Sequence, residues 1–380
     1  MIKPVGFVLL MLCLAHGFTL QAATPSLAAP NPAPHPKFAQ LPDHTVVDLG
    51  PLKLEVPEGE GQGSGAGVTD YSGMTYDLHN HRVLMFGGGH ATTFSDTIYV
   101  FDFKTLQWSS LYKPTPARFY KPENMEKAFW KSGGEGPYPR PAARHTYDLL
   151  LVPEHRKEFL VLMNGCGPSS VAPGIGYFGG GGGAYDFATG KWEPFENAFG
   201  GYGAVAEYDP ISKKVIGQAG QGVFMLDLET RKSVKILDNI IDKHKVTAYS
   251  GTLVYYPPDQ CMYGIGDKKE PWKLELNRQN FAQSKITKLT VTGEQPKPSE
   301  CAFAYDPKSK LIGGGIMGGK FYTFDPAQNV WAAHAMQGDK CTDMTFHCLV
   351  YNPVDNVYLF IGTDPQNQYG KRTYAYRFKK

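Results

Sequence analysis

Apolar and polar residues alternate with a period of two through most of the chain beyond residue 44. The pattern is clearest in residues 73–108, where a strand ends in Tyr76-Asp77, an apolar strand runs into three glycines, and two further short strands end at Trp108. Alternating segments separated by Gly, Asp and Asn turns are typical of an antiparallel meander. Four strands in about this length are the size of one β-propeller blade. The sequence therefore predicts an all-β propeller.

The Tyr-Asp strand end recurs along the chain, which allows the blades to be counted. Successive copies lie 71, 61, 48, 49 and 46 residues apart, and the first two intervals include insertions at residues 113–140 and 165–183. Six four-stranded blades are predicted. Seven remain open if the first insertion hides a degenerate blade, although its NMEKAFW segment favours a short helical turn. The six strand ends are Tyr76-Asp77, Tyr147-Asp148, Tyr208-Asp209, Tyr256-Pro257, Tyr305-Asp306 and Tyr351-Asn352.

The two ends of the chain are predicted to complete one blade together. Residues 45–56 form a strand-like segment before the first blade, and the last blade has three strands, ending with residues 374–378. Propellers commonly close when one terminus supplies the strand that the other lacks. We therefore expect the N-terminal strand to fill the last blade. We also expect three tryptophans to pack between neighbouring blades: Trp108, Trp192 and Trp331.

The first 40 residues differ from the rest in composition. Lys3 precedes a largely apolar stretch, and Gln21-Ala22-Ala23 offers small residues for cleavage, which is typical of a secretory signal peptide. Residues 23–40 are rich in Ala and Pro, as in a disordered spacer. We expect a signal peptide at 1–22, a spacer at 23–40 and a single propeller domain at 41–380. The mature protein is expected to be secreted or periplasmic, without membrane attachment.

Charge and cysteine content narrow the function classes. Lys and Arg total 38 against 36 for Asp and Glu, so the basic excess expected of a nucleic-acid-binding surface is absent. Removal of the signal peptide leaves five of the six cysteines, an odd number that cannot all pair within one chain. Cys341 and Cys348 are the nearest pair and the first candidate for a disulfide.

Polar residues precede the predicted inner strands. Because inner strands line the central channel of a propeller, these residues would form a ring around its entrance, where ligands commonly bind. A purely structural ring would be more apolar, so the polarity indicates either a functional site or a water-filled channel without catalysis. The ring consists of Tyr71, Ser72, Arg144, His145, Gly201, Tyr202, Tyr249, Ser250, Glu300, Cys301, Phe346 and His347.

His90 and Cys166 occupy corresponding loop positions in the first two blades, each after glycine. Their side chains could share a structural zinc or calcium ion, although two ligands are few for a metal site. The alternative is that they hold two loops together, and we expect no required cofactor. His79 and His81 lie in a polar hairpin turn and are expected to be exposed.

The order of parts in residues 73–108 resembles the kelch repeat: Tyr-Asp, an apolar strand into Gly-Gly, a Tyr-x-Phe-Asp strand, and then Trp. The resemblance covers most of the mature chain and implies a propeller of the galactose-oxidase type. A fold-level resemblance does not imply a function.

The residue types in the ring are similar to those of secreted propeller polysaccharide lyases, notably the ulvan lyases. This resemblance implies β-elimination from a uronate-containing polysaccharide. Arg144 would neutralise the sugar carboxylate, His90 or His145 would remove the C5 proton, and Tyr202 or Tyr249 would protonate the leaving oxygen. The remaining candidate substrate-binding residues are Glu300, His347, Trp130 and Tyr71.

Two other functions stay open. A non-catalytic propeller could bind a glycan or a protein through the aromatic residues of the insertions, including Trp130. A copper-radical oxidase of the galactose-oxidase type could use His347 and Cys166, although the adjacent Tyr-His pair of that family is missing. We expect a monomer that acts on, or binds, an acidic polysaccharide.

Overall fold

The computed structural model describes residues 32–58, 66–87, 95–119, 121–126, 129–130, 139–162, 182–195, 199–266, 270–297 and 301–380. The chain divides into two units, residues 1–31 and residues 32–380, and the described residues all belong to the second. The predicted signal peptide therefore lies outside the described residues.

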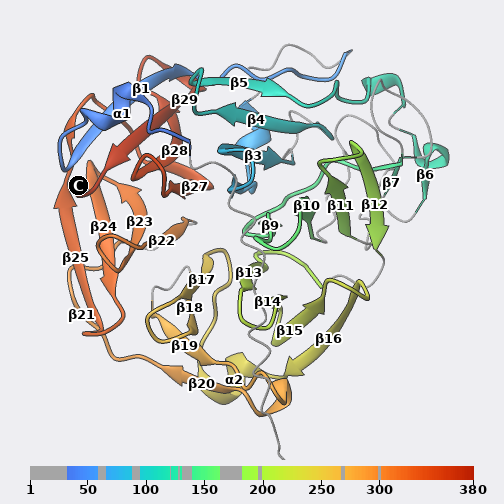
Figure 1. Cartoon of the computed structure of the whole chain (residues 1–380), viewed down its shortest axis with the longest axis vertical. Helices are drawn as coiled ribbons and strands as arrows, with labels where there is room; N and C mark the ends of the chain where they lie inside the picture. Colours follow the sequence, from blue (N-terminus) through green and yellow to red (C-terminus); the bar gives the residue numbers. More distant parts are fainter. Residues whose placement is uncertain are drawn as a thin grey trace, which may run out of the picture. The chain divides into compact units, whose positions relative to one another are not determined.

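The described residues form a six-bladed β-propeller, as predicted, and each blade is an antiparallel meander that runs from the axis outward (Figure 1). Blade one consists of β2 (Met74–Asp77), β3 (Arg82–Phe86), β4 (Ile98–Asp102) and β5 (Gln107–Ser110). Blade two consists of β9 (Leu150–Leu151), β10 (Glu158–Val161), β11 (Gly182–Asp186) and β12 (Lys191–Phe195). Blade three consists of β13 (Val205–Asp209), β14 (Lys214–Ala219), β15 (Gly222–Asp227) and β16 (Lys232–Leu237).

Blades four to six continue this order, and blade six contains the N-terminal strand. Blade four consists of β17 (Thr252–Tyr256), β18 (Cys261–Ile265), β19 (Trp272–Glu275) and β20 (Lys285–Lys288). Blade five consists of β22 (Phe303–Asp306), β23 (Leu311–Met317), β24 (Lys320–Asp325) and β25 (Val330–Ala335). Blade six consists of β27 (Met344–Asn352), β28 (Val357–Asp364), β29 (Asn367–Arg377) and β1 (Thr45–Pro51).

Blade six is closed as the sequence predicts. Strand β1 pairs antiparallel with β29, with Val46 opposite Tyr376, and so supplies the outer strand that the C-terminal segment lacks. Two short strands, β26 (Gln337–Gly338) and β21 (Thr292–Gly293), add parallel pairings to the outer edges of blades six and five. The closure joins the two ends of the propeller through main-chain hydrogen bonds.

Helix α1 (Pro36–Ala39) lies within the segment assigned to the spacer and packs on the propeller. Phe38 is fully buried against Phe103 of blade one, and its carbonyl oxygen accepts a hydrogen bond from Arg377. The ordered domain thus includes residues before 41. The other short helices lie in connections: η1 (Ala66–Thr69), η2 (Ala117–Phe119), η3 (Pro122–Asn124), α2 (Ile240–His244) and η4 (Phe281–Gln283).

The acidic or amide residue at the end of an inner strand holds the turn that follows. Its side-chain oxygen accepts backbone N–H groups two or three residues further on, which is an Asx turn. Asp residues at the ends of four third strands act in the same way: Asp102, Asp186, Asp227 and Asp325. The four inner-strand examples are Asp77, Asp209, Asp306 and Asn352.

Blade two departs from the predicted register. Tyr147-Asp148 lies before β9, and the strand ends near Val152 instead of at Asp148. Asp148 forms an isolated parallel bridge with Val205 of blade three. The assignment of Tyr147-Asp148 as an inner-strand end is therefore wrong, and Asp148 lies at the start of the inner strand.

The first insertion contains no seventh blade among its described residues. It forms a three-stranded sheet of β6 (Met125–Glu126), β7 (Phe129–Trp130) and β8 (Arg140–Pro141). The predicted helical turn in NMEKAFW is wrong, because β6 and β7 run through that segment. Phe129 and Trp130 are buried, and Phe129 packs in the cluster between blades one and two, so tertiary packing outweighs local helix propensity there.

Aromatic residues fill the spaces between blades. Trp108 donates from Nε1 to Thr373 Oγ1 of blade six at 2.8 Å, and Trp192 packs on Phe86 of blade one. These contacts confirm the predicted inter-blade role for two of the three tryptophans. The third, Trp331, is buried against Phe303 and Phe324 of its own blade.

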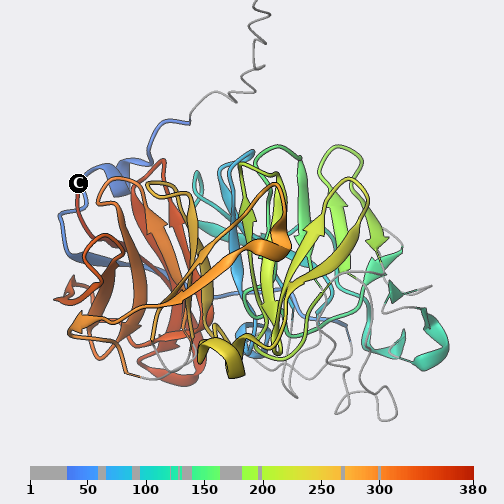
Figure 2. The ribbon, with the colours of Figure 1, turned by 90° about the horizontal axis from the view of Figure 1, so that it is seen from below.

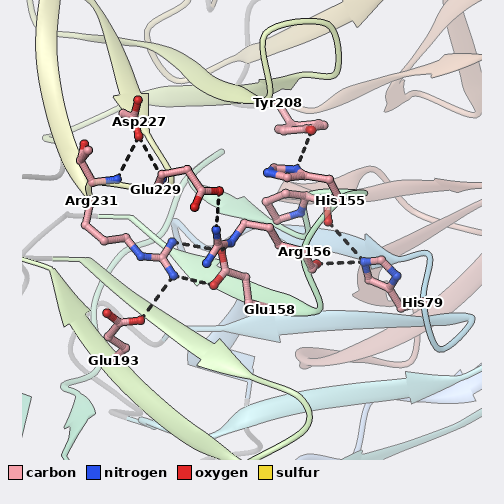
Figure 3. A network of polar contacts seen from close by, with 11 residues as sticks. His79, His155, Arg156, Glu158, Glu193, Tyr208, Asp227, Glu229 and Arg231 are labelled. Carbon is pink, nitrogen blue, oxygen red and sulfur yellow. Dashed lines mark hydrogen bonds and ion pairs between the residues drawn. The ribbon is translucent and has the colours of Figure 1, made fainter. Parts of the chain in front are cut away.

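Ion pairs connect blades two and three (Figure 3). Glu158 of β10 accepts hydrogen bonds from Arg156 at 2.6 Å and from Arg231 of blade three at 2.6 Å. Arg156 also contacts Glu229 at 2.8 Å. Beside this network, His155 Nδ1 lies 2.7 Å from the Tyr208 hydroxyl. The two blades are thus joined by charge as well as by apolar packing.

Candidate functional site

Those of the predicted ring residues that the structure describes lie at one end of the central channel. Inner strands start at this face, and the loops that join second to third strands and fourth strands to the next blade return to the same face. Figure 2 shows α2 and the small sheet of the first insertion at this face, away from α1. We call it the insertion face, because both long insertions leave the blades there. The opposite face carries the hairpin turns.

Five rings contact one another at the insertion face, where the inner strands of blades six, one and two begin, and we call them the axial plug: Tyr71, His145, Tyr147, Phe346 and His347. The Tyr71 ring lies 4.7 Å from His145 and 4.6 Å from Phe346, and Tyr147 lies 5.7 Å from His347. The plug combines rings from blades one, two and six. Four of its residues belong to the ring predicted from the sequence, and the structure brings them together: Tyr71, His145, Phe346 and His347.

The backbone beneath the plug is strained at equivalent positions. Tyr71, Tyr147 and Phe346 have φ angles of 53°, 43° and 44°, in the left-handed region that bulky residues rarely adopt. Strain of this kind persists only where surrounding structure enforces it, and it is concentrated at functional sites. The plug is therefore a specifically held arrangement.

The histidines and the arginine of the predicted site are buried. His145 and His347 are 3% and 1% exposed, and burial lowers the pKa of His347 from 6.5 to about 4, while the Gly251 backbone opposes the shift. Arg144 is 2% exposed, and its Nε donates to the Ala142 carbonyl oxygen at 3.0 Å. Burial lowers the pKa of Arg144 to about 10, so it stays charged at neutral pH.

Tyr202 and Tyr249 are instead exposed, at 47% and 44% of their surfaces. They come from the connections before β13 and β17 in neighbouring blades. These connections touch, since Ser250 N donates to Gly203 O at 3.0 Å and the Tyr249 ring packs over Gly203. Two exposed tyrosines therefore lie on connections that touch each other on the insertion face.

Three predicted site residues, His90, Cys166 and Glu300, lie outside the described residues, and so does the proposed metal pair. Within the described part of the chain, no group of three His, Cys, Asp or Glu side chains is arranged to hold a metal ion. Trp130 is 1% exposed in β7, so its ring supports the insertion.

A cavity of about 440 Å³ occupies the channel between the plug and the turn face. We call it the channel cavity. All six inner strands line it, and it reaches the turns that follow them, where Leu78 and Glu154 are exposed. Its deep end adjoins the plug, because Asp148 directly follows Tyr147 and Leu349 lies two residues after His347.

Besides Glu154 at the mouth, Asp148 and Glu207 line the channel cavity, and neither is among the site residues predicted from the sequence. Asp148 Oδ2 accepts a hydrogen bond from Leu253 N at 3.1 Å, and Glu207 Oε1 accepts one from Tyr208 N at 2.6 Å. Desolvation raises the pKa of Asp148 well above its usual range, and the charge of Glu207 adds to the effect. Desolvation raises the pKa of Glu207 from 4.5 to about 7.

A signal for Glu207 was present in the sequence, because it is a charged residue inside an otherwise apolar strand, VAEYD. The sequence pattern predicts Asp148 only as the last residue of an inner strand, and that prediction gives no reason to place it in a site. The expectation that His81 is exposed is wrong: its ring is 6% exposed, with Nδ1 2.8 Å from the Tyr76 hydroxyl and Nε2 3.3 Å from Asp355.

The predicted Cys341–Cys348 disulfide is also wrong. Neither sulfur is in a disulfide, and the buried Cys348 thiol donates to Ser72 O at 3.3 Å. Burial raises the pKa of both thiols, that of Cys341 to about 11. Both thiols therefore stay protonated at neutral pH.

Replacement of Glu207 by Gln should remove a pH-dependent loss of stability. A carboxyl group whose pKa is raised on folding favours the folded state below its unfolded pKa, and this advantage is lost as the pH rises through the folded value of about 7. Since water in the channel screens the charge, we expect Glu207→Gln to be more stable than the wild type by about 2 kcal/mol at pH 8 and equal to it at pH 4. Urea unfolding at the two pH values measures this difference, and an equal effect at both would contradict it.

No protein-family model matches the sequence, and no curated protein matches it, so the kelch resemblance remains a prediction. Among solved structures, the chain is similar to an auxiliary nutrient binding protein from Bacteroides thetaiotaomicron, with 10% identity and a TM-score of 0.49. The match covers 86% of this chain and 75% of that protein. No helix in the described ranges has the length and apolar character needed to span a membrane. The function therefore has to be inferred from the geometry of the propeller itself.

Proposed function

We propose that the protein binds an acidic polysaccharide on the insertion face of the propeller. The observation that carries the proposal is the pair of exposed tyrosines, Tyr202 and Tyr249, on two connections that touch each other. Aromatic side chains offer a flat apolar surface with a polar hydroxyl, which suits the apolar face and the hydroxyl groups of a sugar ring. Exposed large side chains on a rigid scaffold are typical of binding sites.

Exposed lysines on the same connection and the same face favour an anionic glycan. The connection that leads to Tyr249 carries exposed Lys243 and Lys245 at the end of α2, on the same face (Figure 2). Ammonium groups beside a stacking surface can pair with sugar carboxylates. A uronate-containing polymer would satisfy both parts of this surface.

Catalytic β-elimination is the second candidate, and the states of two buried groups favour it. Arg144 stays protonated at neutral pH, as a carboxylate-binding group must, and His347 stays neutral, as a base must. Catalysis requires a sugar to reach groups that are only 1–2% exposed, whereas binding requires only the exposed tyrosines. Binding is therefore our conclusion, and the lyase reaction is tested alongside it.

We expect Tyr202→Ala and Tyr249→Ala each to weaken polysaccharide binding 5- to 30-fold, which corresponds to about 1–2 kcal/mol of lost stacking. Calorimetry or affinity electrophoresis with ulvan, alginate, pectate, glucuronan and glycosaminoglycans measures this loss. Ile211→Ala is the matched control, because Ile211 is 48% exposed in a hairpin turn on the opposite face.

Equal weakening by the control, or no binding to any polymer of the panel, would contradict the proposal. Absorbance of unsaturated uronate is recorded in the same incubations. A signal that Arg144→Ala abolishes would extend the proposal from binding to eliminative cleavage.

The segment 1–22 supports the further proposal that the mature protein works outside the cytoplasm.

A further inference from the structure

We propose that the channel cavity binds a small organic cation, an ammonium or guanidinium group carried on an apolar body. The cavity opens at the turn face, on the other side of the axial plug from the polysaccharide surface. This site is independent of the proposed function, and it arises from charge, shape and apolar lining together.

The lining is one-sided in charge. Among the described residues that line the cavity there are three carboxylates, Asp148, Glu154 and Glu207, and no Lys, Arg or His. A concave site with charge of one sign and low-dielectric walls focuses the electric field and concentrates ions of the opposite sign. The cavity therefore favours cations over neutral or anionic molecules.

The carboxylates are arranged along the depth of the cavity. Glu154 lies exposed at the mouth, Glu207 lies within β13, and Asp148 lies at the deep end beside the plug. The latter two contact backbone N–H groups of β17, at Leu253 and Tyr255. These positions are two residues apart, or about 7 Å along a strand. A cation entering from the turn face would meet Glu207 and then Asp148.

A carboxylate has about four lone-pair positions, and backbone N–H groups occupy only some of them here. The backbone contacts fix the orientation of both groups and leave acceptor capacity for a ligand. If the only role of these two side chains were to accept hydrogen bonds from β17, the neutral amide oxygen of an Asn or Gln side chain would be enough at each position. Desolvation favours the neutral form of both groups, and a bound cation would stabilise their ionised form. The ability to ionise is the part of these side chains that a purely structural role leaves unexplained, and it is the part that a cation would use.

The rest of the lining fits an apolar body. Leucine, valine and phenylalanine side chains cover the wall, and tyrosines stand on five of the six inner strands. Aromatic rings near a cation add attraction through their π faces. A volume of about 440 Å³ lies within the usual range for small-molecule sites. The tyrosines are Tyr76, Tyr208, Tyr255, Tyr305 and Tyr351.

The test is calorimetric titration of the full mature protein with benzylamine and 1,5-diaminopentane, each against its neutral alcohol counterpart, and with calcium chloride. We expect the amines to saturate the protein and the alcohols to bind at least 10-fold more weakly. Asp148→Asn and Glu207→Gln keep an oxygen acceptor for β17 and should each weaken amine binding at least 10-fold. Glu193→Gln, an exposed carboxylate on an outer strand, is the matched control and should change nothing.

Equal binding of amine and alcohol, absence of saturable amine binding, or binding of calcium in preference to the amines would each overturn the proposal. Circular dichroism and the thermal midpoint establish that the variants are folded. Polysaccharide binding by Asp148→Asn should match the wild type, and amine binding by Tyr202→Ala should also match it. Failure of one proposal is thereby distinguishable from failure of the other.

Discussion

Asp96→Ala is expected to destabilise the protein by about 3–5 kcal/mol, because it breaks a fully buried ion pair and leaves Arg140 without its carboxylate. Asp96 and Arg140 are both 0% exposed, and Arg140 Nε lies 2.9 Å from Asp96 Oδ2. Asp96 also accepts hydrogen bonds from the Thr115 backbone at 2.8 Å and the Thr115 hydroxyl at 2.5 Å. One carboxylate thus holds both ends of the first insertion against blade one.

Urea unfolding at neutral pH measures this loss, and limited proteolysis should show faster cleavage within the insertion. Glu229→Ala is the control: Glu229 is 75% exposed and pairs with Arg156 on the surface, where such pairs contribute less than about 1 kcal/mol. An Asp96→Ala protein with an unchanged unfolding midpoint would mean that the ion pair has no net stabilising role. Unchanged proteolysis would mean that other contacts hold the insertion.

Features that depend on local chemistry along the strand could be predicted from the sequence. The Tyr-Asp pattern marked five of the six inner strands correctly, and in four of them the Asp or Asn accepts the N–H groups of the next turn. The segment at residues 45–56 was predicted to close the propeller, since the last blade lacked a strand, and β1 within it does so. Both inferences follow from hydrogen bonds that a β-strand must make.

Features that depend on which residues converge at the axis could not be predicted in the same way. A shift of the assumed strand end in blade two moved Asp148 from the channel cavity to a supposed turn. The apolar run that ends at Val152-Pro153 was the signal for the correct register. Burial of His145 depends on the rings of Tyr71 and Tyr147, which come from separate blades, and residue type alone does not reveal it.

The stability of the protein is expected to fall by about 3 kcal/mol between pH 7 and pH 4 through His347 alone. Burial lowers the pKa of His347 from 6.5 to about 4, so the unfolded chain binds a proton that the folded protein excludes. The stabilisation is fully present above the unfolded pKa and is lost as the pH falls toward the folded value. A difference of about 2.5 in pKa corresponds to about 3 kcal/mol.

Comparison with His347→Gln isolates this contribution, because carboxylates that titrate in the same range affect both proteins alike. Urea unfolding at pH 7.5, 6.5, 5.5 and 4.5 should give a smaller loss of unfolding free energy for the variant than for the wild type, by about 3 kcal/mol across the series. His244→Gln, at an exposed histidine in α2, should follow the wild type. Parallel curves for His347→Gln and the wild type would mean that the imidazole gains a proton without opening the plug. His347 would then be accessible to protons in the folded protein, which would strengthen its candidacy as a base toward a bound sugar.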